Sequence, residues 1–242
     1  MRMWVFARRN GKEIRRDPIN LCFGLGFPIA LLLLLSAIQG NVPVALFSLP
    51  RLTPGITVFG LSFLTLFSAT IIAKDRRSAL LQRLYTTPLR PVDFILGYAL
   101  PILPMAAVQS AACYLTAIVL GMAPTVNMLW AVLSVLPVST VYIALGLLCG
   151  SVLGDKQVGG ICGALLTNLS AWLSGIWFDL ELVGGAFQKI AELLPFFHAV
   201  ALQRAVLAGD FAGVFPHLWW VLGYAVVLFA AAVICFLRQM RK

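Results

Sequence analysis

The chain has 242 residues, of which 61% are hydrophobic and only 11% are charged, and its formal net charge is +9. A soluble domain typically carries about 25% charged residues, so this composition argues against a soluble globular protein. The basic residues form no separate soluble patch with aromatic residues, which argues against nucleic-acid binding. The five cysteines show neither a disulfide framework nor a metal-ligand spacing, so no metal site is predicted.

Residues 2–17 are predicted to form a basic amphipathic helix ahead of the first apolar run. Trp4, Ala7, Gly11 and Ile14 recur at helical spacing, with basic residues on the other faces. A helix of this kind lies in the membrane interface with its apolar face toward the lipid. The alternative is a disordered basic tail that only sets the topology. The residues expected to make the interfacial contact are Trp4, Phe6, Arg8, Arg9, Lys12 and Arg15.

The transmembrane segments are predicted from long runs without charge. A bilayer core of roughly 30 Å needs about 20 helical residues, and a charge at a span centre costs on the order of 3 kcal/mol. Six spans are predicted near 20–39, 54–73, 93–120, 127–150, 158–178 and 214–237. The chain is therefore expected to be an all-α polytopic membrane protein, with an interfacial segment at 1–18 and a transmembrane domain at 19–242.

Prolines predict where these helices start and bend. A proline in the first helical turn loses no needed N–H, so Pro54 and Pro91 are expected near helix starts. Four other prolines lie inside predicted spans and are expected to kink or break them: Pro28, Pro101, Pro104 and Pro137.

The basic residues predict the orientation of the spans. With six spans, the N-terminus, 74–92, 151–157 and the C-terminus share one side of the membrane. All but three of the 18 Lys and Arg residues lie on that side, the exceptions being Arg51, Lys189 and Arg204. The positive-inside rule then places both termini in the cytoplasm. The same charge predicts attraction to anionic lipid.

The loop between the second and third predicted spans carries a short amphipathic pattern near 76–86. Its apolar stripe consists of Leu80, Leu81, Leu84 and Tyr85, while Arg76, Arg77 and Arg83 stay polar. A short amphipathic helix can dock into a groove on a soluble partner. A solvated basic loop that merely anchors two spans is the alternative that composition leaves open.

The segment before the last span is too long for a plain connector and too polar to cross the membrane. Two short helices are predicted near 180–210, separated at Pro195. We expect them to re-enter the outer leaflet or to lie on it, since backbone at that depth must be covered by protein or water. Gly146 with Gly150, and Gly159 with Gly163, form small-residue pairs that permit close helix packing, either within the chain or between two chains.

Catalytic chemistry is missing from the sequence. There is no phosphate-binding loop, so the chain is not expected to hydrolyse ATP itself. No Asp, Glu, Lys or Arg lies in the core of a predicted span, which argues against an ion-coupled transporter. His198 and His217 are the only histidines, and ordinary polar or interfacial contacts are expected of them. No catalytic residue is predicted.

The whole arrangement resembles the membrane subunit of ABC-2-type exporters. The resemblance is carried by the basic helix at 2–17, the stretch 74–89, the stretch 194–200 followed by Arg204 and Gly209, and the six-span layout. The loop helix departs from the family pattern, which often has Glu and Gly where this chain has residues 75–80.

The resemblance implies that a separate ABC ATPase, which would bind ATP and Mg²⁺, docks on the loop helix. It implies a second permease subunit, of the same or a related chain, and contact with membrane lipid. The ATPase-coupling residues would be Asp75, Arg76, Arg77, Leu80, Leu81, Arg83 and Leu84. The outer gate would comprise Pro195, Phe196, Phe197, His198 and Arg204.

The expected function is thus ATP-driven export of an amphipathic, drug-like or lipid-like substrate across a prokaryotic inner membrane. A non-ABC secondary transporter, or a membrane scaffold with no ATPase partner, is the alternative. An intramembrane enzyme ranks third, because the sequence offers no paired carboxylates or nucleophile with a base.

Overall fold

The computed structural model describes residues 2–41, 48–78 and 91–240, and all regular structure in these ranges is helical. The helices, two of them π-helices labelled η, are α1 (Arg2–Arg15), α2 (Pro18–Leu21), η1 (Cys22–Gly26), α3 (Phe27–Gln39), α4 (Leu49–Arg77), α6 (Pro91–Ala99), α7 (Leu103–Val119), α8 (Val126–Val152), α9 (Asp155–Val158), η2 (Gly159–Leu166), α10 (Thr167–Trp172), α11 (Leu180–Val183), α12 (Gly185–Leu193), α13 (Pro195–Ala208) and α14 (Phe211–Met240). The all-α class is confirmed.

Five helical segments in the described ranges are long and apolar enough to cross a membrane. They are Cys22–Gln39, Leu49–Arg77, Val92–Val119, Val126–Val152 and Phe211–Arg238. The count rises to six if α12 and α13, bent by 75° at their junction, form one broken span. The predicted span near 158–178 is not among these segments, because its helical stretch ends at Trp172 and begins with the polar run Asp155–Gln157. Six spans therefore stay a prediction.

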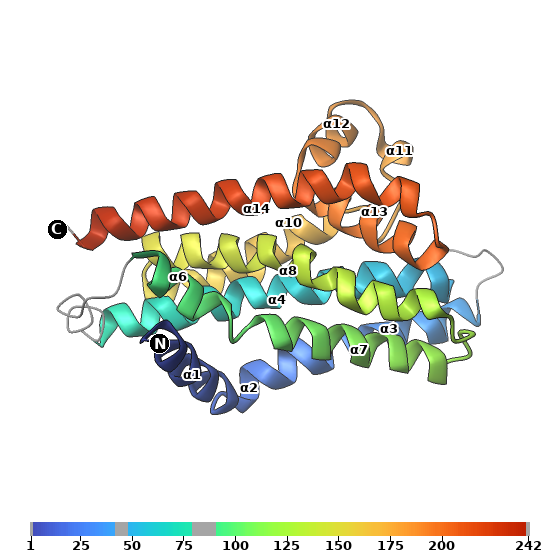
Figure 1. Cartoon of the computed structure of the whole chain (residues 1–242). Helices are drawn as coiled ribbons and strands as arrows, with labels where there is room; N and C mark the ends of the chain where they lie inside the picture. The colour runs from blue at the N-terminus through green and yellow to red at the C-terminus, as the bar shows by residue number, and fades with distance from the viewer. Residues whose placement is uncertain (1, 42–47, 79–90, 241–242) are drawn as a thin grey trace.

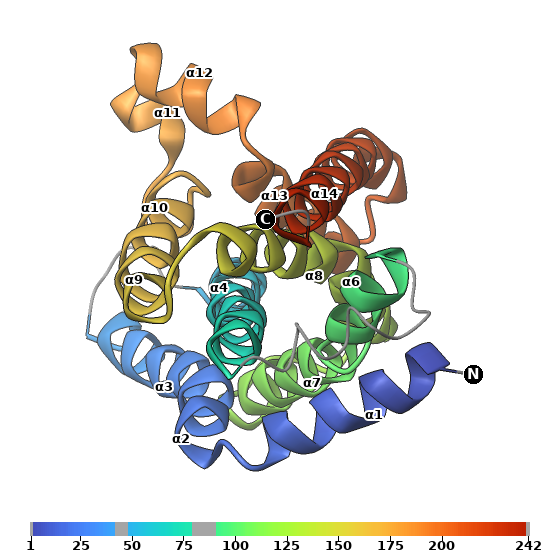
Figure 2. The same cartoon turned by 90° about the vertical axis from the view of Figure 1, so that its left-hand side faces the viewer.

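Helix α4 lies at the centre of the bundle, with α3, α7, α8 and α9 around it (Figure 2). Its most apolar 18-residue window is 78% buried, the highest share among the five segments. Small side chains permit this close packing. A Cβ on Gly150 of α8 would lie only 2.6 Å from the backbone oxygen of Ala69, and one on Gly146 would overlap Ser68. The first glycine pair thus packs within the chain.

The second glycine pair is only partly covered by the chain. A Cβ added at Gly159 or at its neighbour Gly160 would meet nothing within 4 Å, and one at Gly163 would make ordinary contact with Leu66 at 3.4 Å. The start of η2, at Gly159 and Gly160, is therefore open, whereas Gly163 contacts α4.

The prolines act as predicted at some positions and not at others. Pro91 begins α6, and the predicted third span is divided into α6 and α7 around Pro101 and Pro104. The prediction for Pro54 is wrong, since α4 already begins at Leu49 and Pro54 lies inside it. Pro137 lies within α8, which continues without a break from Val126 to Val152.

The two ends of the bundle differ in what they carry (Figure 1). We call the end with α1, the last turn of α4 and the C-terminal end of α14 the basic end. The opposite end carries α11, α12 and α13, three short helices where the sequence predicted two. Gly184 and Gly185 adopt φ values of 62° and 61°, and Gly209 ends α13 with φ 77°, which glycine adopts without steric cost.

Candidate functional site

The basic end is organised around the carboxylate of Asp75, near the end of α4. Asp75 is 4% exposed. Arg9 of α1 donates to it from both terminal guanidinium nitrogens, with Nη1 at 2.5 Å from Oδ2 and Nη2 at 2.8 Å from Oδ1. The Tyr98 hydroxyl of α6 donates to the same Oδ2 at 2.8 Å. One buried carboxylate therefore joins α1, α4 and α6, with the bidentate geometry typical of strong Arg–carboxylate pairs.

The contact also stabilises the charged form of Arg9. The hydrogen bond to Asp75 raises the pKa of the Arg9 guanidinium against the opposing effect of partial burial. A second bond joins α1 directly to α6, since Asn10 Nδ2 donates to the backbone oxygen of Gly97 at 3.0 Å. The neighbouring residues Arg9 and Asn10 thus bond α1 to α4 and to α6.

An aromatic cluster covers this network on its apolar side. The Phe6 ring lies 4.9 Å from that of Tyr98 and 5.7 Å from that of Phe94, both in edge-to-face geometry. Phe94 in turn lies 5.5 Å from Phe236 of α14. Phe6 is 6% exposed. It therefore packs inside the protein rather than at a membrane surface, because Gly97 leaves room for its ring.

Arg76, which follows Asp75 in the sequence, caps the C-terminal end of α8. Its Nη1 donates to the backbone oxygens of Gly150 and Ser151, each at 2.9 Å, and to that of Leu153 at 3.1 Å. The last carbonyls of a helix have no partner within the helix and carry partial negative charge, so a guanidinium there satisfies both needs. Arg77 follows with an ion pair to Asp155, at the start of α9, at 3.2 Å.

The consecutive residues Asp75, Arg76 and Arg77 thus bond α4 to α1 and α6, to α8, and to α9. These are three of the residues predicted for ATPase coupling. The other four, Leu80, Leu81, Arg83 and Leu84, lie outside the described residues, as does the 79–86 part of the predicted loop helix.

Asp17 makes a smaller link between α1, α2 and α4. Its Oδ2 accepts from Asn20 Nδ2 at 2.7 Å and pairs with Lys74 Nζ at 3.4 Å. Burial alone would raise the pKa of Asp17, but the hydrogen bonds from Asn20 and the charge of Lys74 outweigh it and lower that pKa.

At the opposite end, a pair of histidines joins α13 to α14. His198 Nδ1 lies 2.8 Å from His217 Nδ1, and His198 Nε2 lies 2.8 Å from the backbone oxygen of Glu192. A carbonyl oxygen only accepts, so we assign the hydrogen to His198 Nε2. In neutral rings, His198 Nδ1 is then the acceptor for the Nδ1–H of His217. The His198 ring also stacks on Trp220, with centroids 4.8 Å apart and planes at 9°.

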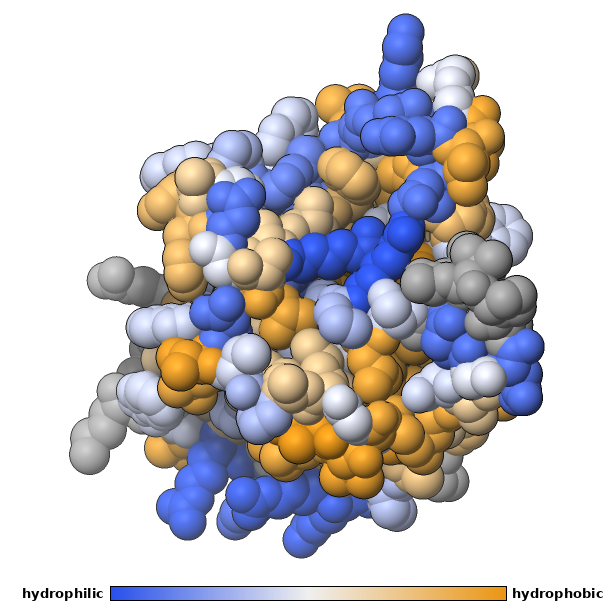
Figure 3. Space-filling view, turned by 90° about the vertical axis from the view of Figure 1, so that its right-hand side faces the viewer, coloured by the Kyte–Doolittle hydropathy of each residue, from blue (hydrophilic) through white to orange (hydrophobic). Residues whose placement is uncertain are grey.

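The remaining outer-gate residues lie around this pair. Pro195 begins α13, Phe196 packs on Tyr142 of α8 at 5.9 Å between ring centroids, and Phe197 lies edge-on to His217 at 6.1 Å. Arg204 Nη2 donates to the backbone oxygen of Gly175 at 3.1 Å. Figure 3 shows this end with hydrophilic side chains extending from its middle to its top and hydrophobic ones gathered below the middle. The structure therefore brings the five predicted residues to one end, and their gating role stays a prediction.

Comparison with known proteins identifies the family of this chain. A family model described as "ABC-2 family transporter protein" matches residues 39–234, most of the chain. The chain belongs to the ABC-2 transporter family. A search of curated proteins found no match. Together with the long apolar helices, the family identifies an integral membrane protein of the permease type found in ABC exporters, and it overrules the alternative of a non-ABC transporter or scaffold.

The family match includes Asp75–Arg77 and all of α13, but it begins after α1. The Arg9–Asp75 pair therefore joins a helix outside the matched range to the central helix within it. Members of this family generally work with an ABC ATPase.

Sequence reasoning missed several residues of these sites, namely Asn10, Gly97, Tyr98 and the role of His217 as partner of His198. Asn10 carried a signal, since it is a polar residue on the buried side of a helix that otherwise places Phe6, Ala7 and Ile14 there. Tyr98 carried none, because one tyrosine in a long apolar run is as often a packing residue as a hydrogen-bond donor.

Proposed function

We propose that the chain is the transmembrane permease subunit of an ABC exporter in a prokaryotic inner membrane. In this proposal both termini are cytoplasmic, α1 lies in the membrane interface, and a separate ATPase docks on the segment around 76–86. ATP and Mg²⁺ would be bound by that ATPase. The observation that carries the proposal is the set of bonds made by Asp75, Arg76 and Arg77, directly ahead of the docking segment.

These bonds supply a path for force from the ATPase to the spans. A displacement of the docking segment acts on the end of α4, which is bonded to α1, α6, α8 and α9 within three residues. Because packed helices and charge-assisted bonds resist gradual deformation, such a displacement favours movement of these helices as a body. This is the motion that alternating access of a permease requires.

The proposed complex contains a second permease subunit, of the same or a related chain. Its support is the open start of η2, where a Cβ added at Gly159 or Gly160 would meet nothing within 4 Å. Leu165 and Trp172 are 54% and 55% exposed in the same stretch of chain. Small residues beside apolar side chains are typical of helix pairs in membranes.

The proposed substrate is amphipathic, drug-like or lipid-like. Support comes from the five apolar segments, whose most apolar windows hold no more than two charged residues each. Such surfaces suit a cargo that partitions into the bilayer rather than a hydrophilic ion.

Co-purification tests this proposal. The full-length chain, affinity-purified from its native membrane in a mild detergent, is expected to bring with it an ATPase that carries a phosphate-binding loop, detected by mass spectrometry. The variant Leu80→Asp/Leu84→Asp is expected to lose at least ten-fold of that ATPase while inserting normally, because two carboxylates in an apolar docking face must be desolvated.

Leu182→Asp is the matched control, since Leu182 is 80% exposed at the opposite end. It is expected to retain the ATPase. Failure of any such ATPase to co-purify contradicts the permease proposal, and retention by the double variant contradicts the docking assignment.

A further inference from the structure

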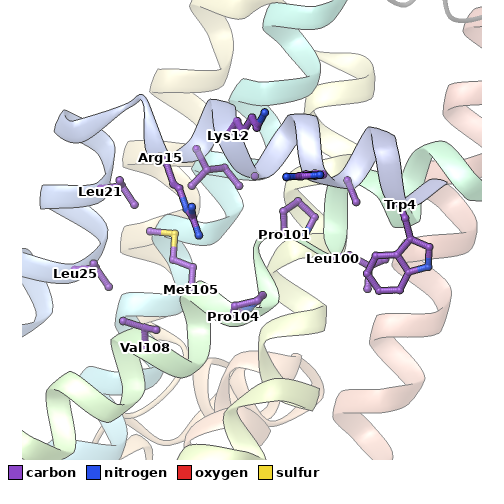
Figure 4. A pocket seen from close by; sticks show the side chains of 14 residues that line it. Trp4, Lys12, Arg15, Leu21, Leu25, Leu100, Pro101, Pro104, Met105 and Val108 are labelled. Carbon is purple, nitrogen blue, oxygen red and sulfur yellow. The ribbon is translucent and has the colours of Figure 1, made fainter. Parts of the chain in front are cut away.

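The basic end contains a cavity to which the proposed function assigns no role. It has a volume of about 790 Å³ and lies beneath α1, bounded by α2 and η1 on one side and by the break between α6 and α7 on the other (Figure 4). Cavities of this size hold small molecules or part of a lipid.

The walls of this cavity, which we call the α1 groove, are apolar. They are formed by side chains from each bounding element, chiefly Leu21, Leu25, Leu100, Pro101, Met105 and Val108. Val108 of α7 is 58% exposed, and Trp4 at the other end of the groove is 65% exposed. The apolar lining thus continues onto the outside of the bundle, where an acyl chain can lie along α7.

The rim of the α1 groove is cationic. Arg8, Lys12 and Arg15 all line it, and their spacing of four and then three residues places them on one face of α1. Figure 4 shows Arg15 extending from α1 toward Met105.

These three cations lack the counter-charges that their neighbours have. Arg9 pairs with Asp75 and Glu13, whereas no ion pair among the described residues involves Arg8, Lys12 or Arg15. Three cations in a row above an apolar cavity favour a ligand that supplies both a negative charge and hydrocarbon. A neutral lipid would leave the rim unpaired, and a free inorganic anion would leave the walls exposed.

We propose that the α1 groove binds one anionic phospholipid of the surrounding bilayer, with its phosphate at Arg8, Lys12 and Arg15 and an acyl chain along Leu25, Met105 and Val108. The lipid bridges α1 and α7, which are otherwise joined mainly through α6. Since α1 carries Arg9, an occupied groove holds Arg9 in place for Asp75. The inference rests on the interfacial placement of α1 in the proposed function and does not depend on the ATPase.

Native mass spectrometry of the purified full chain tests the proposal. The protein is titrated with phosphatidylglycerol, with phosphatidylcholine of the same acyl chains, and with inorganic phosphate. A basic residue near an anionic lipid surface contributes about 1 kcal/mol, or roughly five-fold in affinity. Arg8→Gln/Arg15→Gln is therefore expected to weaken phosphatidylglycerol binding roughly 25-fold, and Arg8→Lys/Arg15→Lys is expected to restore most of it.

Arg16→Gln/Arg238→Gln is the matched control. It removes the same charge at the same end of the bundle, and neither residue lines the α1 groove. Its phosphatidylglycerol affinity is expected to change by less than two-fold, and all variants are expected to unfold at the same temperature without added lipid.

Three outcomes overturn the proposal. If the control variant loses as much phosphatidylglycerol affinity as Arg8→Gln/Arg15→Gln, the lipid is attracted by diffuse charge and not by this site. If phosphatidylcholine binds as tightly as phosphatidylglycerol, the groove recognises hydrocarbon alone. If inorganic phosphate displaces phosphatidylglycerol, the rim binds an isolated anion and does not require a lipid. ATPase co-purification is measured in the same preparations, so failure of the permease proposal is seen separately.

Discussion

The contacts around Asp75 at the basic end and those around His198 at the opposite end are made by different chemistry. At the basic end, the bonds involve charged groups. Arg9 pairs with the buried Asp75, and Arg76 donates to three backbone carbonyls at the end of α8. At the opposite end, the His198–His217 pair and the Glu192 carbonyl form a chain of neutral hydrogen bonds between α12, α13 and α14 beside aromatic rings. Charged groups at this end bond other elements, since Arg204 donates to the Gly175 carbonyl and Arg51 pairs with Asp179. Charge-assisted hydrogen bonds are about twice as strong as neutral ones.

The proposed function gives this difference a role. A permease driven from one side needs a stiff connection between the driven segment and its helices, and an outer end that opens at lower energetic cost. In the proposed exporter, the charged bonds at the end of α4 would meet the first need, and the neutral chain between α13 and α14 would meet the second. Variants at the two ends test this comparison.

The largest effect is expected at Asp75. Asp75→Asn should lower the free energy of unfolding by about 2–3 kcal/mol, because Arg9 loses its carboxylate and Tyr98 loses a charged acceptor. The measurement is the unfolding midpoint in detergent. Glu13→Gln is the control, since Glu13 lies 3.8 Å from Arg9 with its side chain 51% exposed. It should cost less than about 0.5 kcal/mol, and an equal effect of both variants would contradict the central role of Asp75.

A smaller effect is expected at His198. His198→Phe should lower the free energy of unfolding by about 1–2 kcal/mol, because the Glu192 carbonyl and the His217 Nδ1–H lose their partner. Trp219→Phe, at a 70% exposed position of the same end, should change it by less than about 0.5 kcal/mol. ATPase co-purification should be unchanged in His198→Phe. If His198→Phe lost more co-purifying ATPase than Asp75→Asn, the assignment of ATPase coupling to the basic end would be contradicted.

The smallest effect concerns pH and Asp17. Its pKa is lowered in the folded protein, so its contribution to stability is fully present above the unfolded value of about 3.9 and is lost as the pH falls through the folded value. Between pH 5 and pH 3 (a range set by about one unit on either side of that unfolded value), Asp17→Asn should lose less stability than the natural chain. The difference should stay below about 1 kcal/mol, because the Lys74 partner is exposed, and it should shrink in high salt.

Much of the fold could be predicted from local features of the chain. Five of the six predicted spans lie on a long apolar helical segment and end within a few residues of its end, since a charge-free run of that length has few other stable environments. The predicted span at 158–178 does not coincide with such a helix. Its helical stretch has a polar start and ends at Trp172, so its apolar part is too short to cross a membrane. The start predicted at Pro54 failed because a proline is also tolerated inside a long membrane helix when neighbouring groups take up the freed carbonyl.

Less of the site could be predicted in this way. The basic residues of α1 look alike in the sequence, yet Arg9 is bonded to Asp75 whereas Arg8 and Arg15 line an open groove. Phe6 and Trp4 look equally suited to a membrane surface, yet only Trp4 is exposed. Helical periodicity gives the angle of a residue around its helix, and it does not give the element that the residue faces.

The sequence by itself determined the membrane-spanning class, the polar segments and the family resemblance, because these depend on the lengths of apolar runs and on short local motifs. Only the tertiary structure decided which charges are paired. Arg9 meets Asp75 across 66 residues, Arg76 meets Gly150 across 74, and His198 meets His217 across 19. Such contacts depend on how helices pack against one another, and that packing is set by the fit of side chains such as Phe6 against Gly97 rather than by any pattern within one helix.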